Sequence, residues 1–596
     1  MGYRTLKSCL DDLRRTRQLI EFNDEVDPYL ELAAVQRRLY AAEAPAVLFT
    51  QPKNCRFPML ANLFGTEKRV EYIFRDGIKP LQLAMKIASE QPPKFSFKEI
   101  PSLIKSFYYS RPKKVNSRFA PVFACKTTLD QLPQLVSWHE DGGAYLTLPQ
   151  VYTESPNHPG VATSNLGMYR VQISGNDYIP NEECGLHYQI QRGIALHHAE
   201  AKQLGRYLPV KIFIGGAPCM TLAAVMPLPE NVSEILFAGI LGQHRIPMTL
   251  SAAVCRLPSA DSIYAEADFC ITGILDTEEK TEGPFGDHLG YYSLAHQFPV
   301  VKVHSVYHRN DAIFPFTVVG RPPQEDTQFG KFIHNLVGDV IPKKIPGVRA
   351  VHAVDEAGVH PLLLAIGREA YLPLDPNRRA AELHTLAHAL LGYGQLSLAK
   401  YLFLAAEGDD PNLSVEDTAL FLQHVLRRVN WRDDVHFVTK TTADTLDYTG
   451  GELHRGSKFF TAVSGKPRRE LCRELPESLS ARNPRLAMPG VLCAEEIDWY
   501  GTFPDEIPLI VLVDESAESA SSLRNFLWTT FTKSDPASDV HGIGEFVENK
   551  HWGCTGALVI DAKRKPHHAP ELVELPEIVR RADEIADKIC TNVTNR

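Results

Sequence analysis

The sequence predicts a mixed α/β (α+β) protein built from three domains. At 596 residues, the chain is too long for one hydrophobic core and favours two to four domains. Patterns typical of helices and strands alternate near both ends, as they do in α/β domains. The middle third instead carries many short β-branched runs punctuated by Gly, Pro and Asn, which favours a barrel or a sandwich.

The first predicted domain covers residues 1–115 and has the pattern of a small α/β unit. Two amphipathic helical patterns fall within 8–40, and short apolar runs at 46–49 and 57–64 predict strands. Residues 88–118 are rich in Lys, Pro and Ser, which is typical of connecting chain.

The second predicted domain, residues 116–325, is dominated by strands. We predict strands at 145–148, 161–163, 169–173, 209–214, 269–274, 300–307 and 314–319. Helical patterns interrupt them at 188–204 and 232–241.

The third predicted domain, residues 326–596, returns to alternating helices and strands. We predict helices at 327–337, 378–393 and 414–429, the last of them with Ser414 as its N-cap, and strands at 401–405 and 509–513. This alternation indicates a second α/β domain.

The last predicted helix begins at Leu575 and carries one apolar stripe of Ile578, Ala582, Ile585 and Ile589. Such a stripe packs either on the chain's own domain or on a second subunit. We predict that it packs on a second subunit and supports a homo-oligomer.

Composition narrows the class of protein. The net charge is -9 with no basic block, so the sequence offers no electrostatic case for binding nucleic acid or an anionic membrane. The longest apolar strings are too short to span a bilayer, and the first residues lack the apolar core of a secretory signal. The eleven cysteines are scattered and never spaced C-x-x-C, which predicts free thiols in the cytoplasm.

The stretch at 281–288 is the strongest candidate for chemistry. Glu282 and Asp287 lie five residues apart, with two glycines, one proline and one aromatic between them. A tight loop of this composition can aim both carboxylates into one cleft, where the pKa of one of them would rise. The alternative is a surface turn with two solvated acids.

Three further segments carry polar groups in apolar surroundings. Arg170 needs an anionic partner or a bound anion, and it can share a site with Asn165 only if Asn165 lies on a bend. His187 is a possible metal ligand or a hydrogen-bonded structural residue. Arg192 precedes a glycine and could hold a phosphate. Glu234 could bind a hard cation or simply favour the start of a helix.

The order and spacing of these motifs resemble the UbiD family of prenylated-FMN-dependent decarboxylases over about residues 10–430. The matching stretches are 165–170, 187–193, 227–239, 282–292 and 318–326. The loop at 282–287 and the Gly-Arg-Pro-Pro segment within 318–326 are the most specific of them. The last 150 residues or so resemble the family only loosely. For residues 116–325 the resemblance implies a split β-barrel that binds the flavin.

The resemblance also implies the cofactor and its ligands. The family uses prenylated FMN, whose phosphate is bridged to the protein by Mn²⁺ or Mg²⁺ and by K⁺. Asn165, His187 and Glu234 would hold the divalent metal, and their oxygen and nitrogen atoms suit such an ion. The implied cofactor contacts are Met168, Tyr169, Arg170, Tyr188, Gln189, Arg192, Gly193 and Lys400.

The catalytic residues implied by the resemblance are Arg170, Glu282 and Asp287. Loss of CO₂ from an sp² carbon leaves electrons that side chains cannot stabilise, so a cofactor must take them up. Arg170 would pair with Glu282, and Asp287 would donate the proton that replaces CO₂. For that, Asp287 must be protonated, which we expect from a dry cleft and a neighbouring carboxylate.

The resemblance implies a reversible, non-oxidative reaction on a small carboxylic acid. Aspartate at position 287 resembles the branch that acts on hydroxylated aromatic acids in ubiquinone or menaquinone biosynthesis, and α,β-unsaturated acids are the other substrate class. A flavin prenyltransferase would supply the cofactor, and the enzyme would be a dimer or a hexamer.

Three other classes stay open at this point. A flavin-binding oxidoreductase lacks support because no G-x-G-x-x-G follows a predicted strand. A metal-dependent hydrolase lacks an H-E-x-x-H motif. An inactive assembly subunit of a decarboxylase complex is disfavoured because Arg170, Glu282 and Asp287 are all present.

Overall fold

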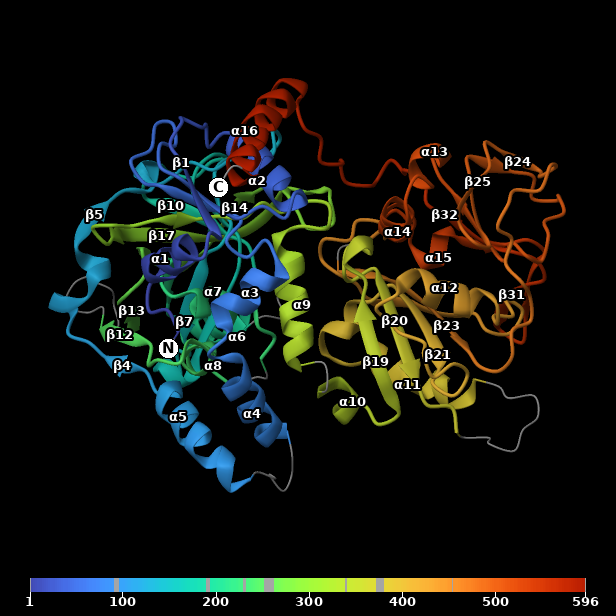
Figure 1. The fold of residues 1–596 in the computed structure, drawn as a ribbon, viewed down its shortest axis with the longest axis horizontal. Coiled ribbons are helices and arrows are strands. Elements are labelled where there is room, and N and C mark those ends of the chain that lie inside the picture. The colour runs from blue at the N-terminus through green and yellow to red at the C-terminus, as the bar shows by residue number, and fades with distance from the viewer. Residues whose placement is uncertain are drawn as a thin grey trace.

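The computed structural model describes residues 2–89, 96–188, 193–228, 232–250, 262–337, 340–370, 380–452 and 454–594. Figure 1 shows two lobes. The first lobe contains residues up to 337 together with the final helix, and the second lobe contains the rest of the C-terminal third. The chain therefore begins and ends in the same lobe.

A four-stranded sheet with helices around it forms the N-terminal part of the first lobe. The strand order is β1-β2-β3-β18, and β18 comes from much later in the chain. Its strands are β1 Leu19–Phe22, β2 Ala46–Phe49, β3 Met59–Ala61 and β18 Phe314–Pro315, and its helices are α1 Leu6–Arg15, α2 Glu31–Ala41, α3 Glu67–Phe74, α4 Ile78–Ser89 and α5 Ile100–Ser110. Thr5 caps α1 by accepting a hydrogen bond from the Ser8 backbone N–H.

A nine-stranded antiparallel sheet forms the centre of the first lobe. The order is β6-β9-β10-β17-β14-β11-β7-β8, and β5 pairs with β17. Its strands are β5 Cys125–Thr127, β6 Tyr145–Leu146, β7 Gln150–Glu154, β8 Ser164–Gly167, β9 Val171–Gln172, β10 Glu183–Leu186, β11 Leu208–Ile214, β14 Phe269–Glu282 and β17 His296–His308. This sheet confirms the mixed α/β class and the β-rich character of the central third.

Shorter elements complete the central region. They are strands β4 Lys113–Lys114, β12 Pro247–Leu250, β13 Ser262–Tyr264, β15 Phe285–Gly286 and β16 Tyr292–Ser293, with helices α6 Gly193–Gln203, α7 Pro218–Val225, α8 Glu234–Gly242 and α9 Glu325–Val337. The long strands β14 and β17 pair with each other, and the candidate catalytic loop lies in the connection between them.

The second lobe contains two five-stranded sheets, as expected for an α/β domain. One has the order β19-β20-β21-β23-β22 and the other β25-β26-β28-β32-β29. Their strands are β19 Val348–Ala353, β20 Leu362–Gly367, β21 Tyr401–Ala406, β22 His436–Thr442, β23 Arg455–Val463, β25 Arg485–Met488, β26 Val491–Ala494, β28 Leu509–Leu512, β29 Val540–Gly542 and β32 Leu558–Asp561. One hydrophobic core, which includes Phe403 and Val511, joins the two sheets.

The remaining elements surround these sheets. The helices are α10 Val340–Lys344, α11 Ala381–Leu391, α12 Thr418–Leu426, α13 Ser516–Ser519, α14 Leu523–Thr532 and α15 Pro536–Asp539, while the final helix, α16 Pro576–Thr594, lies in the first lobe. Two small antiparallel pairs are β24 Ala481–Arg482 with β27 Glu496–Ile497, and β30 Glu545–Glu548 with β31 His551–Cys554.

Two local predictions are wrong. Residues 161–163 form a short 3₁₀ helix rather than a strand, because Thr163 and Ser164 use their hydroxyl groups to close turns onto Gly160 and Val161. Helix α12 begins at Thr418 with Asp417 as its N-cap. Ser414 is not the cap, since its hydroxyl accepts the Glu416 backbone N–H before the helix starts.

The final helix packs on its own chain. Ala582, Ile585 and Ile589 are buried in the same core as Val35 and Leu39 of α2, and Figure 1 shows α16 beside α2. The prediction that this stripe is buried by a second subunit is therefore wrong. An apolar stripe on a helix indicates that this face is buried. The sequence does not show whether the same chain or a second chain buries it.

Among the described residues, none of the helices combines the length and the apolar character that crossing a bilayer would require.

We expect Ile585→Ala to destabilise the first lobe by about 2–5 kcal/mol, because truncating a buried aliphatic side chain removes burial and leaves a cavity. Urea unfolding followed by fluorescence measures the change. Asp587→Ala, on the exposed face of the same helix, is the matched control. Equal midpoints for the two variants would contradict the packing of α16 on α2.

Candidate active site

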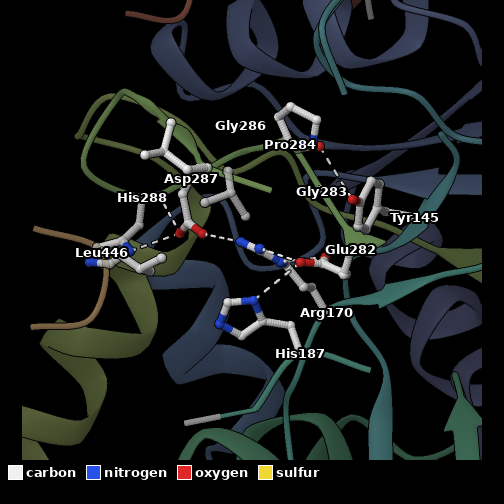
Figure 2. A network of polar contacts seen from close by, with 12 residues as sticks. Tyr145, Arg170, His187, Glu282, Gly283, Pro284, Gly286, Asp287, His288 and Leu446 are labelled. Atoms are coloured by element: carbon white, nitrogen blue, oxygen red, sulfur yellow. Dashed lines mark hydrogen bonds and ion pairs between the residues drawn. The ribbon is translucent and has the colours of Figure 1, made fainter. Parts of the chain in front are cut away.

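A buried guanidinium group between two carboxylates forms the centre of the candidate site. Arg170 Nε and Nη2 donate to Glu282 Oε1 and Oε2 at 2.9 and 2.7 Å, and Arg170 Nη1 donates to Asp287 Oδ2 at 2.5 Å. Figure 2 shows the three side chains in one line. The Glu282 side chain has no exposed surface, and that of Asp287 is 13% exposed. The alternative of a turn with two solvated acids is therefore wrong.

Breaks in the sheet bring these residues together. Arg170 lies in the gap between β8 and β9, so the bend expected near Asn165 occurs after that residue. Glu282 ends β14, and Asp287 follows β15. Gly283 has φ +89°, a backbone conformation that glycine adopts without strain.

Hydrogen bonds hold the loop between the two carboxylates in place. The Gly283 N–H donates to Gln172 Oε1 at 3.0 Å, and the Gly286 N–H donates to Asp141 Oδ1 at 2.8 Å. The Tyr145 hydroxyl donates to the Pro284 carbonyl at 3.3 Å, as Figure 2 shows. The loop is therefore a fixed connection that presets the positions of both acids.

The charges of the network differ from the expected pattern. Burial raises the pKa of Glu282, but Arg170 and His187 outweigh it and lower that pKa to about 2. Burial also opposes ionisation of Asp287, yet His288 and Arg170 hold its pKa well below its usual range. The prediction that one carboxylate raises the pKa of the other is wrong for this structure, because a guanidinium group stands between them.

His288 is the residue that sequence reasoning missed. Its backbone N–H and its ring Nδ1 lie 2.7 and 2.9 Å from Asp287 Oδ1. Burial disfavours the charge on His288, but the bond to Asp287 prevails and raises its pKa to about 9. The position of His288 directly after Asp287 in the sequence was the signal that could have indicated its role. The sequence does not show that the ring folds back onto its neighbour.

The three residues predicted to bind a metal come from three elements. Asn165 lies in β8, His187 follows β10, and Glu234 is the first residue of α8. Glu234 Oε2 accepts the Leu166 backbone N–H at 2.9 Å, so Glu234 lies next to the strand that carries Asn165. His187 Nδ1 lies 3.3 Å from Glu282 Oε2, which connects His187 to the network of Arg170, Glu282 and Asp287.

These donors fit a divalent cation. Burial raises the pKa of Glu234 to about 7, and a carboxylate that has lost hydration gains strongly from a nearby cation. Burial and the charge of Arg170 lower the pKa of His187, which keeps its imidazole neutral and able to bind a metal. Mixed oxygen and nitrogen donors of this kind suit Mn²⁺ or Mg²⁺.

Most of the predicted cofactor contacts lie around the start of α6. Tyr169 and Tyr188 have ring centroids 6.5 Å apart, and the Tyr188 hydroxyl lies 2.5 Å from His198 Nδ1. The Met168 N–H donates to the Ala224 carbonyl at 2.9 Å. A Cβ at Gly193 would lie 2.3 Å from Asn165 Oδ1, so the backbone of Gly193 lies close to the Asn165 side chain.

Three predicted cofactor contacts remain, which are Gln189, Arg192 and Lys400. Gln189 and Arg192 lie outside the described residues. Lys400 lies in the second lobe, where its Nζ contacts Asp447 Oδ2 at 2.7 Å and Thr449 Oγ1 at 3.1 Å.

The second lobe packs against the chain that follows Asp287. The Trp528 indole N–H donates to the Leu289 carbonyl at 2.8 Å, and its ring stacks on Tyr291 at 5.2 Å. The Leu294 N–H donates to the Tyr448 hydroxyl at 3.1 Å. The candidate site therefore lies in the first lobe, with the second lobe against its catalytic loop.

Three domain models of one family match the chain in order. The N-terminal, Rift-related and C-terminal domains of 3-octaprenyl-4-hydroxybenzoate carboxy-lyase match residues 10–90, 113–322 and 327–462, respectively. These matches cover more than half of the chain. The chain belongs to the UbiD family of carboxy-lyases, which confirms the resemblance of its motifs.

Full-length relatives occur in Chlamydia. An uncharacterized protein of Chlamydia trachomatis is 37% identical over 597 residues, which span 96% of this chain and 97% of that protein. A Chlamydia pneumoniae protein, named as one of the subunits of a 4-hydroxybenzoate decarboxylase, is 36% identical over 605 residues, which span 97% of each chain.

Solved structures share the fold at lower identity. The vanillic acid decarboxylase of Sedimentibacter hydroxybenzoicus in its closed form has a TM-score of 0.65 and 21% identity, covering 80% of this chain and 97% of that chain. The UbiD-class enzyme HmfF from Pelotomaculum thermopropionicum in complex with FMN has a TM-score of 0.61 and 20% identity, with coverage of 79% and 97%. An evolved dimeric form of HmfF in complex with prFMN has a TM-score of 0.59 and 20% identity, with coverage of 80% and 97%.

We expect Glu282→Gln to destabilise the protein by roughly 3–5 kcal/mol at neutral pH, because it removes one partner of a buried charge pair. The folded-state pKa of Glu282 lies below its ordinary value of 4.5, so its contribution is complete above about pH 4.5 and disappears as pH falls towards 2. Thermal unfolding of both proteins across pH 2–7 measures this. A difference between them that does not change over pH 2–5 would contradict the ion pair.

Proposed function

We propose that this protein is a prenylated-FMN-dependent decarboxylase that removes CO₂ reversibly, without oxidation, from an aromatic or α,β-unsaturated carboxylic acid. The observation that carries the proposal is the buried network of Arg170, Glu282 and Asp287 in a chain of the UbiD family. HmfF, a structural neighbour, binds FMN in one structure and prFMN in another, which supports the cofactor.

The cofactor would bind beside β8 and the start of α6. Asn165, His187 and Glu234 would hold Mn²⁺ or Mg²⁺ against the flavin phosphate, with K⁺ as the second ion. Met168, Tyr169, Tyr188 and Gly193, together with Gln189, Arg192 and Lys400, would contact the flavin. When bound, the flavin supplies the electron sink that decarboxylation at an sp² carbon requires.

In this proposal, Arg170 would control the charge of Asp287, and Asp287 would transfer the proton. Without substrate, His288 and Arg170 keep Asp287 ionised. A substrate carboxylate approaching Arg170 adds negative charge next to Asp287, which favours uptake of a proton on Asp287 Oδ2. After CO₂ leaves, Asp287 would pass this proton to the carbon that carried the carboxyl group. Glu282 would keep Arg170 oriented throughout.

A hydroxylated aromatic acid is the proposed substrate class. The Chlamydia pneumoniae relative carries the name of a 4-hydroxybenzoate decarboxylase, and one structural neighbour is a vanillic acid decarboxylase. The family description names an octaprenyl hydroxybenzoate, which supports a link to quinone biosynthesis. A flavin prenyltransferase would supply the cofactor to a homo-oligomeric, cytoplasmic enzyme, a dimer or a hexamer.

The test of this function is CO₂ release by protein co-expressed with a flavin prenyltransferase. The substrates are a panel of hydroxybenzoic, other aromatic and alkenyl acids, with exchange of labelled bicarbonate as a second measurement. We expect turnover of a hydroxylated aromatic acid only when the flavin absorbance is present. Cofactor-loaded protein that neither releases nor exchanges CO₂ with any of them would overturn the proposal.

We expect Asp287→Asn to lower kcat by roughly 10²–10⁴, the usual contribution of a positioned general acid, with cofactor occupancy unchanged. Asp287→Glu should keep partial activity, because its acid lies one methylene further out. The matched control is Asp177→Asn, an exposed acid of the same lobe. Turnover by Asp287→Asn within about threefold of wild type, at equal flavin absorbance, would remove Asp287 from the mechanism.

We expect Glu234→Ala to lose bound metal and flavin together, because the metal would join the flavin phosphate to the protein. Metal analysis and the flavin absorbance of the purified variant measure both losses. Purification of this variant with full flavin content would show that the metal assignment is wrong.

A further inference from the structure

A second group of possible metal ligands lies where the two lobes meet. His288 follows Asp287 in the first lobe, His360 lies just before β20, and Asp444 follows β22. One ligand atom from each of the three lies within 4.8 Å of the other two. Asp444 is buried, and both histidines are half-buried. Side chains from three distant segments thus converge on one point.

The distance between two of these ligand atoms is close to the distance between ligand atoms around a bound metal ion. His360 Nε2 lies 3.7 Å from Asp444 Oδ2. Two ligand atoms on a tetrahedral zinc ion lie roughly 3.4 Å apart, given metal–ligand distances of about 2.0–2.2 Å. Small side-chain rotations would therefore complete the site. Two imidazoles and one carboxylate suit Zn²⁺ and similar divalent transition metals.

The groups around the three side chains also match a metal site. His288 uses Nδ1 to contact Asp287 Oδ1 at 2.9 Å, which leaves Nε2 as its metal-binding atom. Histidines that bind a metal through one ring nitrogen usually donate the other N–H to a carboxylate. Asp444 Oδ1 accepts the Leu446 backbone N–H at 3.0 Å, while its Oδ2 faces His360. Figure 2 shows the contact between His288 and Asp287.

The local charge favours a cation. The carboxylates of Asp287, Asp444 and Asp326 all act electrostatically on His288. Without an ion, a proton on His288 and the guanidinium of Arg170, which lies on the far side of Asp287, offset part of this charge. An ion that binds His288 Nε2 takes the place of that proton. A divalent ion between His288 and Asp444 would balance the rest in a region that water reaches poorly.

We propose that His288, His360 and Asp444 bind one divalent transition-metal ion, Zn²⁺ or an ion of similar preference, which ties the second lobe to the catalytic loop. Three protein ligands leave a fourth position for water. The site is separate from Asn165, His187 and Glu234, and it does not depend on the proposed decarboxylation. By holding His288 from one side, the ion would fix the ring that contacts Asp287.

The test is Zn²⁺ binding by the full-length chain after treatment with a chelator, measured by calorimetry and metal analysis. We expect one Zn²⁺ per chain at this site. His360→Gln and Asp444→Asn should each weaken that binding by more than 10²-fold, since loss of an outer partner alone costs roughly 10–100-fold. Asp287→Asn, which removes such an outer partner, should weaken it by roughly 10–100-fold.

Two controls locate the ion. His304→Gln, an exposed histidine of β17, should bind Zn²⁺ as wild type does. Glu234→Gln should also keep this Zn²⁺, because Glu234 belongs to the other metal site. Zinc that is lost in Glu234→Gln but kept in both His360→Gln and Asp444→Asn would overturn the proposal.

Two measurements keep the test decisive if a variant misfolds. X-ray absorption of the wild-type zinc complex should show two imidazole ligands, and Zn²⁺ should raise the melting temperature of wild type and of His304→Gln. Absence of a stoichiometric zinc ion, or fewer than two imidazoles in its spectrum, would overturn the site. If the melting temperature does not change with Zn²⁺, the proposal that the ion connects the two lobes is wrong.

Discussion

The buried guanidinium group of Arg170 is the interaction on which the rest of the structure depends. Bringing three charges out of water costs several kcal/mol for each ion, and their attraction offsets that cost only when the geometry is good. Arg170 meets this condition with two parallel bonds to Glu282 and one to Asp287. The fixed loop at 283–286 and the gap between β8 and β9 are the backbone features that make this geometry possible.

Sequence reasoning found the members of this network but not its charges. Arg170 needed an anion, and the loop at 281–288 offered two, so the Arg170–Glu282 pair could be predicted. The ionised state of Asp287 could not, because it depends on the position of Arg170 between the acids and on the orientation of the His288 ring. Arg170 lies more than a hundred residues from either acid in the chain, and the orientation of the His288 ring depends on torsion angles that the sequence does not fix.

The fold, too, could be predicted from the sequence only in part. The sequence pattern predicted β11 and β21 from short apolar runs, and it predicted α9 from a helical pattern. It failed at 161–163, where local hydroxyl hydrogen bonds prevail over β-branched side chains. It also could not identify the partner of α16, since burial against α2 and burial against a second chain require the same stripe. His360 and Asp444 gave no signal at all, because the folding of the second lobe brings these two together and only the packing of the lobes brings His288 to them.

The position of α16 constrains the order in which this protein can be completed during synthesis. The apolar face of α2 is made early in the chain, but α16, the helix that covers it, is made only after the long stretch between them. At about 5–20 residues per second, the ribosome needs roughly 30–100 s to produce the intervening chain. Throughout that interval the core of the first lobe carries an uncovered apolar face, and the lobe closes only when α16 has been made and packs on α2.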